Sequence, residues 1–160
     1  KSDTATTLFL KKRKFNIKKI NKNKIKFNNF ISIKKIDKFK KKMSKRKNMF
    51  NKIITISKKK KVKNWIYGAS SSCSELFTIY DLNQKSFSGI IDSDKSKKNL
   101  IVLSCPKLKI NYYSGIKNIK NDTIFIATRS SRIVEKFLIK QKHAGIIVSI
   151  FDGKILNQKL

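Results

Sequence analysis

The chain has 160 residues, of which 40 are Lys or Arg and 9 are Asp or Glu, so its formal charge is 40 − 9 = +31. A surface of this sign repels itself in isolation and suits a polyanionic partner, of which nucleic acid is the densest. One His and two Cys argue against a zinc site, a disulfide framework or a Ser-His-Asp relay. No apolar run reaches the ~18 residues of a membrane span. We therefore expect a nucleic-acid-binding protein with no catalytic residues, no metal and no cofactor.

Residues 1–63 carry 25 basic and 2 acidic side chains, which gives 25 − 2 = +23, and they contain neither Gly nor Pro. Apolar residues are too sparse there to build a core, so we expect a basic low-complexity arm that is disordered when free and becomes ordered on RNA. Its opening, residues 1–15, is basic, contains Ser and Thr and is nearly free of acid. This is compatible with the remnant of an organelle-targeting segment.

Part of this arm has the pattern of a helix that forms once its charge is neutralised. Apolar residues recur at three-, four- and seven-residue spacings: Ile36, Phe39, Met43, Phe50, Ile53 and Ile54. One hypothesis is a basic helix lying on RNA. The alternatives are a helix on an anionic membrane surface and a solvated low-complexity segment.

From residue 64 onward the composition is that of a globular domain. Residues 65–67, 76–80 and 86–91 are rich in aromatic and β-branched residues and are predicted strands. The polar turn 81–85 between the last two predicts a hairpin. Residues 99–114 are apolar with mixed spacing, and Pro106 would break a helix there, so their structure stays open.

The end of the chain has the pattern of a β-α-β unit. Residues 123–127 are a predicted buried strand, residues 131–143 a helix ended by Gly145, and residues 146–151 a last strand. Such a unit implies a right-handed crossover and at least one parallel strand pair. We therefore predict an α/β fold with a single domain (64–160) that contains a mixed sheet. Along the chain its elements are three strands, an uncertain helix and a β-α-β unit. The basic arm (1–63) precedes this domain.

Two blocks of this domain stand in the same order as those of a known RNA-binding family. The first is Ala69-Ser70 followed by residues 76–88. The second is residues 124–152, with Thr128-Arg-Ser-Ser-Arg132 before the helix and Ala144-Gly145 after it. Together they resemble the universal small-subunit ribosomal protein eleven family, whose loop after the third strand is richer in Gly than this one. The resemblance implies an rRNA-binding protein, and its divergence would suit a mitochondrial ribosome.

The candidate RNA-binding residues lie in three loops. The loop before the predicted helix 131–143 combines free backbone N–H groups with two arginines, which favours a phosphate; the alternative is an N-cap serine with exposed arginines. Two lysine clusters are further candidates: one precedes the domain and the other follows its third strand. The alternative for each cluster is ordinary solvated charge. The residues of these three loops are Arg129, Ser130, Ser131 and Arg132; Lys58, Lys59, Lys60 and Lys61; Lys95, Lys97 and Lys98.

Two further groups of residues have alternative roles. Trp65 and Tyr67 could stack on bases or belong to the core. Glu75, Asp81 and Asp92 surround the expected hairpin, where a two-metal nuclease would also place carboxylates, but turn and edge residues account for all three. A nuclease is therefore the most distant of the functions that we weigh.

The function that we expect is a structural constituent of the small ribosomal subunit. It would bind rRNA through phosphate and shape contacts beside neighbouring ribosomal proteins, with no small-molecule substrate and no membrane span. We expect a mitochondrial location, with another organelle or the cytoplasm as the alternative. The runner-up is a free-standing nucleic-acid-binding protein, such as a nucleoid or RNA-processing factor.

Overall fold

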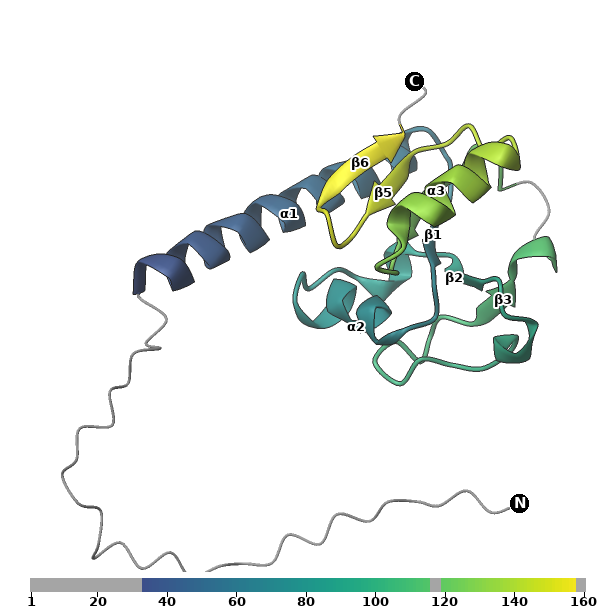
Figure 1. Ribbon diagram of the computed structural model, residues 1–160, viewed down its shortest axis with the longest axis horizontal. Coiled ribbons are helices and arrows are strands. Elements are labelled where there is room, and N and C mark those ends of the chain that lie inside the picture. The colour runs from purple at the N-terminus through teal and green to yellow at the C-terminus, as the bar shows by residue number, and fades with distance from the viewer. Residues whose placement is uncertain (1–32, 116–118, 158–160) are drawn as a thin grey trace, which may run out of the picture. The chain divides into compact units, whose positions relative to one another are not determined.

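The computed structural model of the protein describes residues 33–115 and 119–157, which form one α/β unit with a single mixed sheet (Figure 1). The elements within these ranges are α1 (Ile33–Lys59), β1 (Asn64–Tyr67), α2 (Ser71–Thr78), β2 (Gly89–Asp92), β3 (Ile110–Tyr112), β4 (Thr123–Ile126), α3 (Ser131–Lys140), β5 (Ile147–Ser149) and β6 (Lys154–Asn157). The predicted α/β class and mixed sheet are thus confirmed.

The order of the strands across the sheet is β3-β2-β1-β4-β5-β6. The first five strands are parallel, and β6 pairs antiparallel with β5. The chain therefore starts at the centre, builds β2 and β3 on one side of β1, and then returns to build β4, β5 and β6 on the other side. The strand order therefore reverses between β1 and β4, from which the chain continues toward opposite edges of the sheet.

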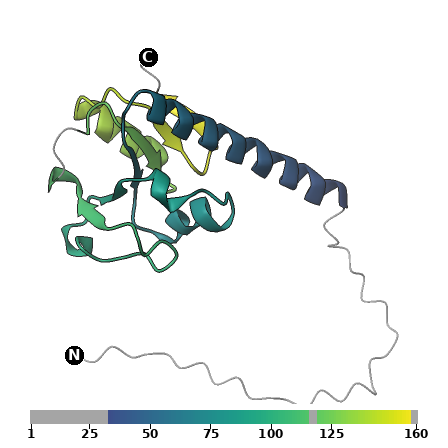
Figure 2. The same ribbon diagram turned by 180° about the vertical axis from the view of Figure 1, so that it is seen from behind.

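Helices cover both faces of this sheet. Alternate side chains of the strands point to opposite faces. One set packs with α1 and α2: Ile66, Ile90, Ile110, Phe125 and Val148. The other set packs with α3: Trp65, Tyr67, Ile91, Ile124, Ile126 and Ile147. Figures 1 and 2, seen from opposite sides, show α1 and α3 on opposite faces of β5. Burial on both faces explains why β1, β2 and β4 are almost continuously apolar.

Helix α1 belongs to this unit rather than to a separate arm. Phe50 and Ile53 are fully buried, and the Phe50 ring lies 5.9 Å from that of Phe125 on β4. The hydroxyls of Ser57 and Thr123, 2.7 Å apart, join the end of α1 to the start of β4. The predicted helical stripe is therefore present, but it forms by packing on the sheet. The compact unit begins at Ile33, not at residue 64. The expectation of a disordered arm is therefore wrong for residues 33–59. Residues 1–32 lie outside the described part.

The predicted hairpin is wrong, because residues 71–78 form α2 and β1 pairs with β2 in parallel. Residues 76–80 have the composition of a strand, yet tertiary burial overrides that preference. Cys73, Leu76 and Tyr80 stand at helical spacing on the buried side of this segment. The predicted third strand, 86–91, corresponds to β2 at Gly89–Asp92.

The remaining elements follow the expected order with shifted ends. Residues 99–114 form no α-helix; they contain a turn around Pro106, the short strand β3 and part of a 3-10 turn. The predicted helix 131–143 is α3, and the predicted last strand corresponds to β5. Strand β6 was not predicted. No helix in the described residues is long and apolar enough to cross a membrane.

The packing of α1 can be tested with two phenylalanines of the same helix. Phe50 is fully buried, whereas Phe39 is 60% exposed. We expect F50A to lower the free energy of unfolding by about 3–5 kcal/mol, because it leaves a cavity against the sheet. F39A should change it by less than about 0.5 kcal/mol. Urea unfolding of the full chain measures both, and equal effects of the two variants would show that α1 does not pack on the domain.

Candidate functional site

The loops that follow β1, β2 and β4 meet at the carboxyl ends of the parallel strands and enclose a crevice of about 400 Å³. Cavities of roughly 300–1,000 Å³ are typical of small-molecule sites. One wall of this crevice is polar and the other is apolar. Its lining residues are Tyr67, Gly68, Ala69, Ser70, Asp92, Ser93, Lys97, Thr128, Ile133, Val134 and Phe137.

Gly68 makes the close approach of the first and third loops possible. Its φ of +105° is in the region that side chains rarely adopt, and a Cβ there would collide with the methyl group of Thr128. Its N–H donates to the carbonyl oxygen of Ile91 at 2.8 Å. The chain can therefore leave β1 and turn at once into α2 while it stays bonded to β2 and close to the loop after β4.

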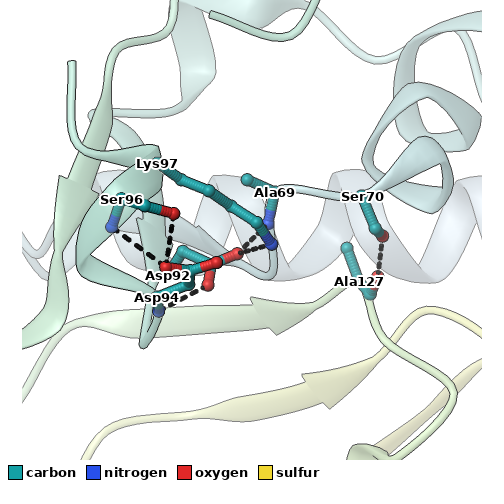
Figure 3. A network of polar contacts seen from close by, with 7 residues as sticks. All are labelled: Ala69, Ser70, Asp92, Asp94, Ser96, Lys97 and Ala127. Atoms are coloured by element: carbon teal, nitrogen blue, oxygen red, sulfur yellow. Dashed lines mark hydrogen bonds and ion pairs between the residues drawn. The ribbon is translucent and has the colours of Figure 1, made fainter. Parts of the chain in front are cut away.

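Asp92, at the end of β2, is the central polar group of the crevice (Figure 3). Its Oδ2 accepts from the N–H of Ala69 at 2.8 Å and from Nζ of Lys97 at 3.1 Å. Its Oδ1 accepts from the N–H of Asp94 at 2.8 Å. The carboxylate of Asp92 thus joins the loop after β1 to the loop after β2. Within the loop after β2, Asp94 accepts in turn from the N–H and the hydroxyl of Ser96.

These bonds decide the charge state of Asp92. Burial alone would raise the pKa of the carboxyl, but the N–H groups of Asp94 and Ala69 and the ammonium of Lys97 outweigh it. The pKa therefore lies below its usual value, and Asp92 is ionised at neutral pH. A carboxylate held in this way is a poor general base, because an effective base has a pKa near the working pH.

Two hydroxyl groups stand between the first and third loops. Ser70 donates to the carbonyl oxygen of Ala127 at 2.8 Å (Figure 3). Its side chain therefore does not cap α2, whose first N–H groups have no partner within the helix. The Thr128 Oγ1 is buried and makes no hydrogen bond to any described residue. Donors and acceptors are thus available where the crevice borders on the amino end of α2.

The apolar wall comes from β1 and α3. The Tyr67 and Phe137 rings lie 6.4 Å apart, and Tyr113 lies 5.0 Å from Phe137. Burial, together with the negative charge of Asp92, raises the pKa of Tyr67, so its hydroxyl stays protonated at neutral pH. Ile133, on the first turn of α3, is 70% exposed. A flat apolar group can therefore lie against aromatic and branched side chains on this side.

The predicted phosphate site before α3 has a carboxylate in it. Asp152 Oδ2 accepts from the hydroxyls of Ser131 at 3.0 Å and Ser149 at 2.7 Å. Arg132 is paired with Glu135 at 2.7 Å, while Arg129 and Ser130 are exposed. The hydrogen bond from Ser149 is the main cause that lowers the pKa of Asp152, so this carboxylate is also ionised. Negative charge at the amino end of α3 opposes a phosphate there.

The two predicted lysine clusters are also separated. Of the cluster after β2, Lys97 lines the crevice, whereas Lys95 and Lys98 are exposed and do not line it. In the other cluster, Lys58 and Lys59 are the last residues of α1, and Lys61 is exposed in the turn that follows. Lys60 lines a cavity of about 520 Å³ at the opposite, amino ends of the strands.

The structure separates the aromatic and the acidic residues that the sequence suggested for base stacking and for metal binding. Trp65 is buried and its indole donates to Asp122 at 2.9 Å, so it belongs to the core, whereas the largely buried Tyr67 also lines the crevice. Asp81 is paired with Lys47 at 3.0 Å, and Glu75 lies on α2. In the described ranges no three His, Cys, Asp or Glu residues gather as a metal site would require.

Gly68 was not predicted from the sequence as a site residue, and Asp92 was weighed only as a turn or edge residue or a nuclease carboxylate. The signal was a Gly directly after an apolar strand, in Gly68-Ala-Ser-Ser-Ser-Cys73, with an acidic residue 92 − 68 = 24 positions later. Dinucleotide-binding β-α-β units have the pattern G-x-G-x-x-G/A and an acidic residue about 20 positions on. Here Ser70 and Cys73 occupy the second and third positions of that pattern, so the motif is degenerate.

Comparisons with protein-family models, with curated proteins and with solved structures find no match for this chain.

The hydrogen bonds of Asp92 predict a pH dependence of stability. Its folded pKa is below the unfolded value of about 3.9, so the unfolded state binds more protons in this range. The stabilisation is complete above about pH 5 and is lost as the pH falls from there through the folded pKa. In D92N this part of the acid transition should disappear.

Urea unfolding between pH 2 and 6 measures this effect. D81N removes the same charge from an exposed position and is the matched control. If D92N and D81N have the same pH profile, the Asp92 bonds do not contribute to stability.

Proposed function

We propose that the domain binds a nucleotide-sized, phosphate-bearing ligand in the crevice at the carboxyl ends of β1, β2 and β4. The observation that carries the proposal is the position of the crevice, between the loops of β1 and β4, where the strand order reverses. Open parallel sheets bind ligands at this switch point, and the order 3-2-1-4-5-6 is that of Rossmann-type nucleotide-binding sheets. The antiparallel direction of β6 is a departure from that pattern.

The polar and apolar walls suggest how such a ligand would lie. The phosphate would approach the amino end of α2, where no side-chain cap bonds the first N–H groups of the helix. A base or another flat group would pack on Tyr67 and Phe137. Asp92 uses three of its roughly four acceptor positions within the protein, which leaves one for a ribose hydroxyl, and the Lys97 ammonium can donate further hydrogen bonds.

The departures from the dinucleotide motif narrow the ligand class. A Gly at the second position lets the backbone approach a pyrophosphate, and here Ser70 adds a side chain that is bonded to Ala127. The crevice volume is also near the lower end for small-molecule sites. We therefore favour a mononucleotide or a similar phosphate ester over a dinucleotide. This proposal departs from the expectation of no small-molecule substrate and no cofactor, and the ionised Asp92 favours binding over catalysis.

A second proposal, binding of rRNA, is favoured by the charge of +31. It includes the role in the small subunit of a mitochondrial ribosome and, as its alternative, a free-standing nucleic-acid-binding protein. Of the two blocks that resemble the ribosomal family, the second forms a strand-helix-strand unit in β4, α3 and β5. The hairpin of its first block is absent, since residues 71–78 form α2. Charge is thus the main support for this second proposal.

The nucleotide proposal can be tested with two neighbouring lysines. Lys97 lines the crevice, whereas Lys98 is exposed on the same loop. A mononucleotide such as AMP or UMP is titrated into the full chain by calorimetry, in 0.3 M salt to suppress contacts with the general positive charge. We expect K97Q to weaken binding about tenfold, because a charge-assisted hydrogen bond contributes roughly 1.5–3 kcal/mol. K98Q should leave the affinity unchanged.

Absence of binding by the unsubstituted chain across the common nucleoside monophosphates would overturn the proposal. An equal loss in K97Q and K98Q would also overturn it, since binding would then follow net charge rather than the crevice.

A further inference from the structure

Helix α1 carries a row of lysines along its exposed side. Six lysines are spaced by 4, 3, 4, 7 and 7 residues and are all exposed: Lys34, Lys38, Lys41, Lys45, Lys52 and Lys59. At 3.6 residues per turn they fall within a sector of roughly 60°, and at 1.5 Å per residue the row is about 38 Å long. We call these six residues the lysine row.

The opposite side of α1 is used by the domain. Phe50 and Ile53 enter the core there. Two basic residues near that side, Arg46 and Lys47, contact Tyr80 at 3.4 Å and Asp81 at 3.0 Å. Figures 1 and 2 show the amino-terminal half of α1 extending beyond the sheet. The lysine row therefore faces away from the sheet, on a helix that packing holds in place.

The electrostatics of α1 require a counterion. Its sequence has 12 basic residues and 1 acidic residue, which gives 12 − 1 = +11. Lys34 and Lys35 stand in its first turn, where the helix dipole already places positive charge. A bound polyanion would relieve both sources of repulsion along the whole length of the row.

We propose that the lysine row binds the phosphate backbone of a structured nucleic acid, with RNA duplex as the partner. A linear row of ammonium groups suits a regular line of phosphates, and lysines act there as point charges that displace counterions. The inference goes beyond the nucleotide crevice. It deepens and rests on the second proposal, nucleic-acid binding, but does not require that the protein belong to a ribosome.

The apolar residues of α1 favour nucleic acid over a membrane surface. A helix lying on a membrane buries a continuous apolar face in the lipid. In α1 the carboxyl-terminal part of that face is occupied by the sheet, through Phe50 and Ile53. On the projecting part Ile36 is 41% and Phe39 60% exposed, and two such residues form too short an apolar face.

The test compares two fourfold variants of the full chain with equal charge. K38Q/K41Q/K45Q/K52Q removes four lysines of the row, and K85Q/K107Q/K136Q/K140Q removes four exposed lysines elsewhere in the domain. Lys and Gln have similar helix propensity, and circular dichroism checks that both variants fold. A third variant, K38R/K41R/K45R/K52R, keeps the charge of the row.

Binding to a 20-base-pair RNA duplex is measured from 50 to 300 mM salt. Each lost phosphate contact lowers the slope of log affinity against log salt by about 0.9, so the row Gln variant should lose about 3 to 4 in slope. Its affinity at 100 mM salt should fall about tenfold or more relative to the control variant. The row Arg variant should retain the slope of the unsubstituted chain, and K97Q, which changes the crevice, should leave the duplex affinity within about twofold.

Two results would overturn the inference. Equal loss of slope in the row and control variants would show that binding follows net charge. Unchanged duplex binding by the row variant would show that the row does not bind the duplex, and lost binding to vesicles containing phosphatidylserine would then assign the row to a membrane. Loss of RNA binding by every variant and by the unsubstituted chain would instead refute the second proposal itself and leave the crevice proposal standing.

Discussion

The pairing of β1 with β4 at the centre of the sheet is the constraint on which the rest of the structure depends. Four residue pairs, from Asn64 with Thr123 to Tyr67 with Ile126, hold these strands parallel, and both strands are buried on both faces. The chain leaves β1 toward one edge of the sheet and β4 toward the other. Their loops consequently diverge, and the crevice is the space between them. Ser70 and Ala127 are joined across that space, which fixes its width.

A buried carboxylate organises the crevice in a protein whose charge is strongly positive. Asp92 gathers two backbone N–H groups and Lys97, so one lysine of the exposed loop after β2 is drawn into the site. The charges inside the crevice are therefore balanced locally, while the excess of positive charge lies outside it, most densely on α1. Under the two proposals, this separation would let one small domain present two binding surfaces of different chemistry. The crevice would select by shape and hydrogen bonding, and the lysine row by charge.

The features predicted from sequence were those that local pattern determines. The apolar run of β4, the amphipathic α3 and the α/β class follow from residues near one another in the chain. Helix α2 was missed because Leu76 to Tyr80 are strand formers, and their helical state depends on packing against the sheet. The role of α1 in the core was missed because sparse apolar residues among lysines resemble an unfolded arm. Phe50 is buried because distant parts of the chain, Tyr80 and Phe125 on β4, pack against it.

The candidate site could be predicted only in part, for the same reason. The lysines and the loop before α3 were chosen by charge and position, and only Lys97 and Thr128 lie in the crevice. The decisive residues, Gly68 and Asp92, act through contacts between loops 23 to 60 positions apart, such as Asp92 with Ala69 and Gly68 with Thr128. The carboxylate of Asp152 at the amino end of α3 likewise comes from a distant part of the chain. Charge and position in the sequence did not reveal this carboxylate beside the predicted phosphate site.

The central claim, that the crevice at the β1–β4 switch point is a nucleotide site, is tested most directly by mapping amide chemical shifts. The full chain, labelled with ¹⁵N, is titrated with a mononucleotide in 0.3 M salt. The account predicts that shifts concentrate at residues 68–72, 92–97 and 128, the loops that line the crevice. Shifts confined to α1, or spread over exposed lysines without a maximum at these loops, would contradict it.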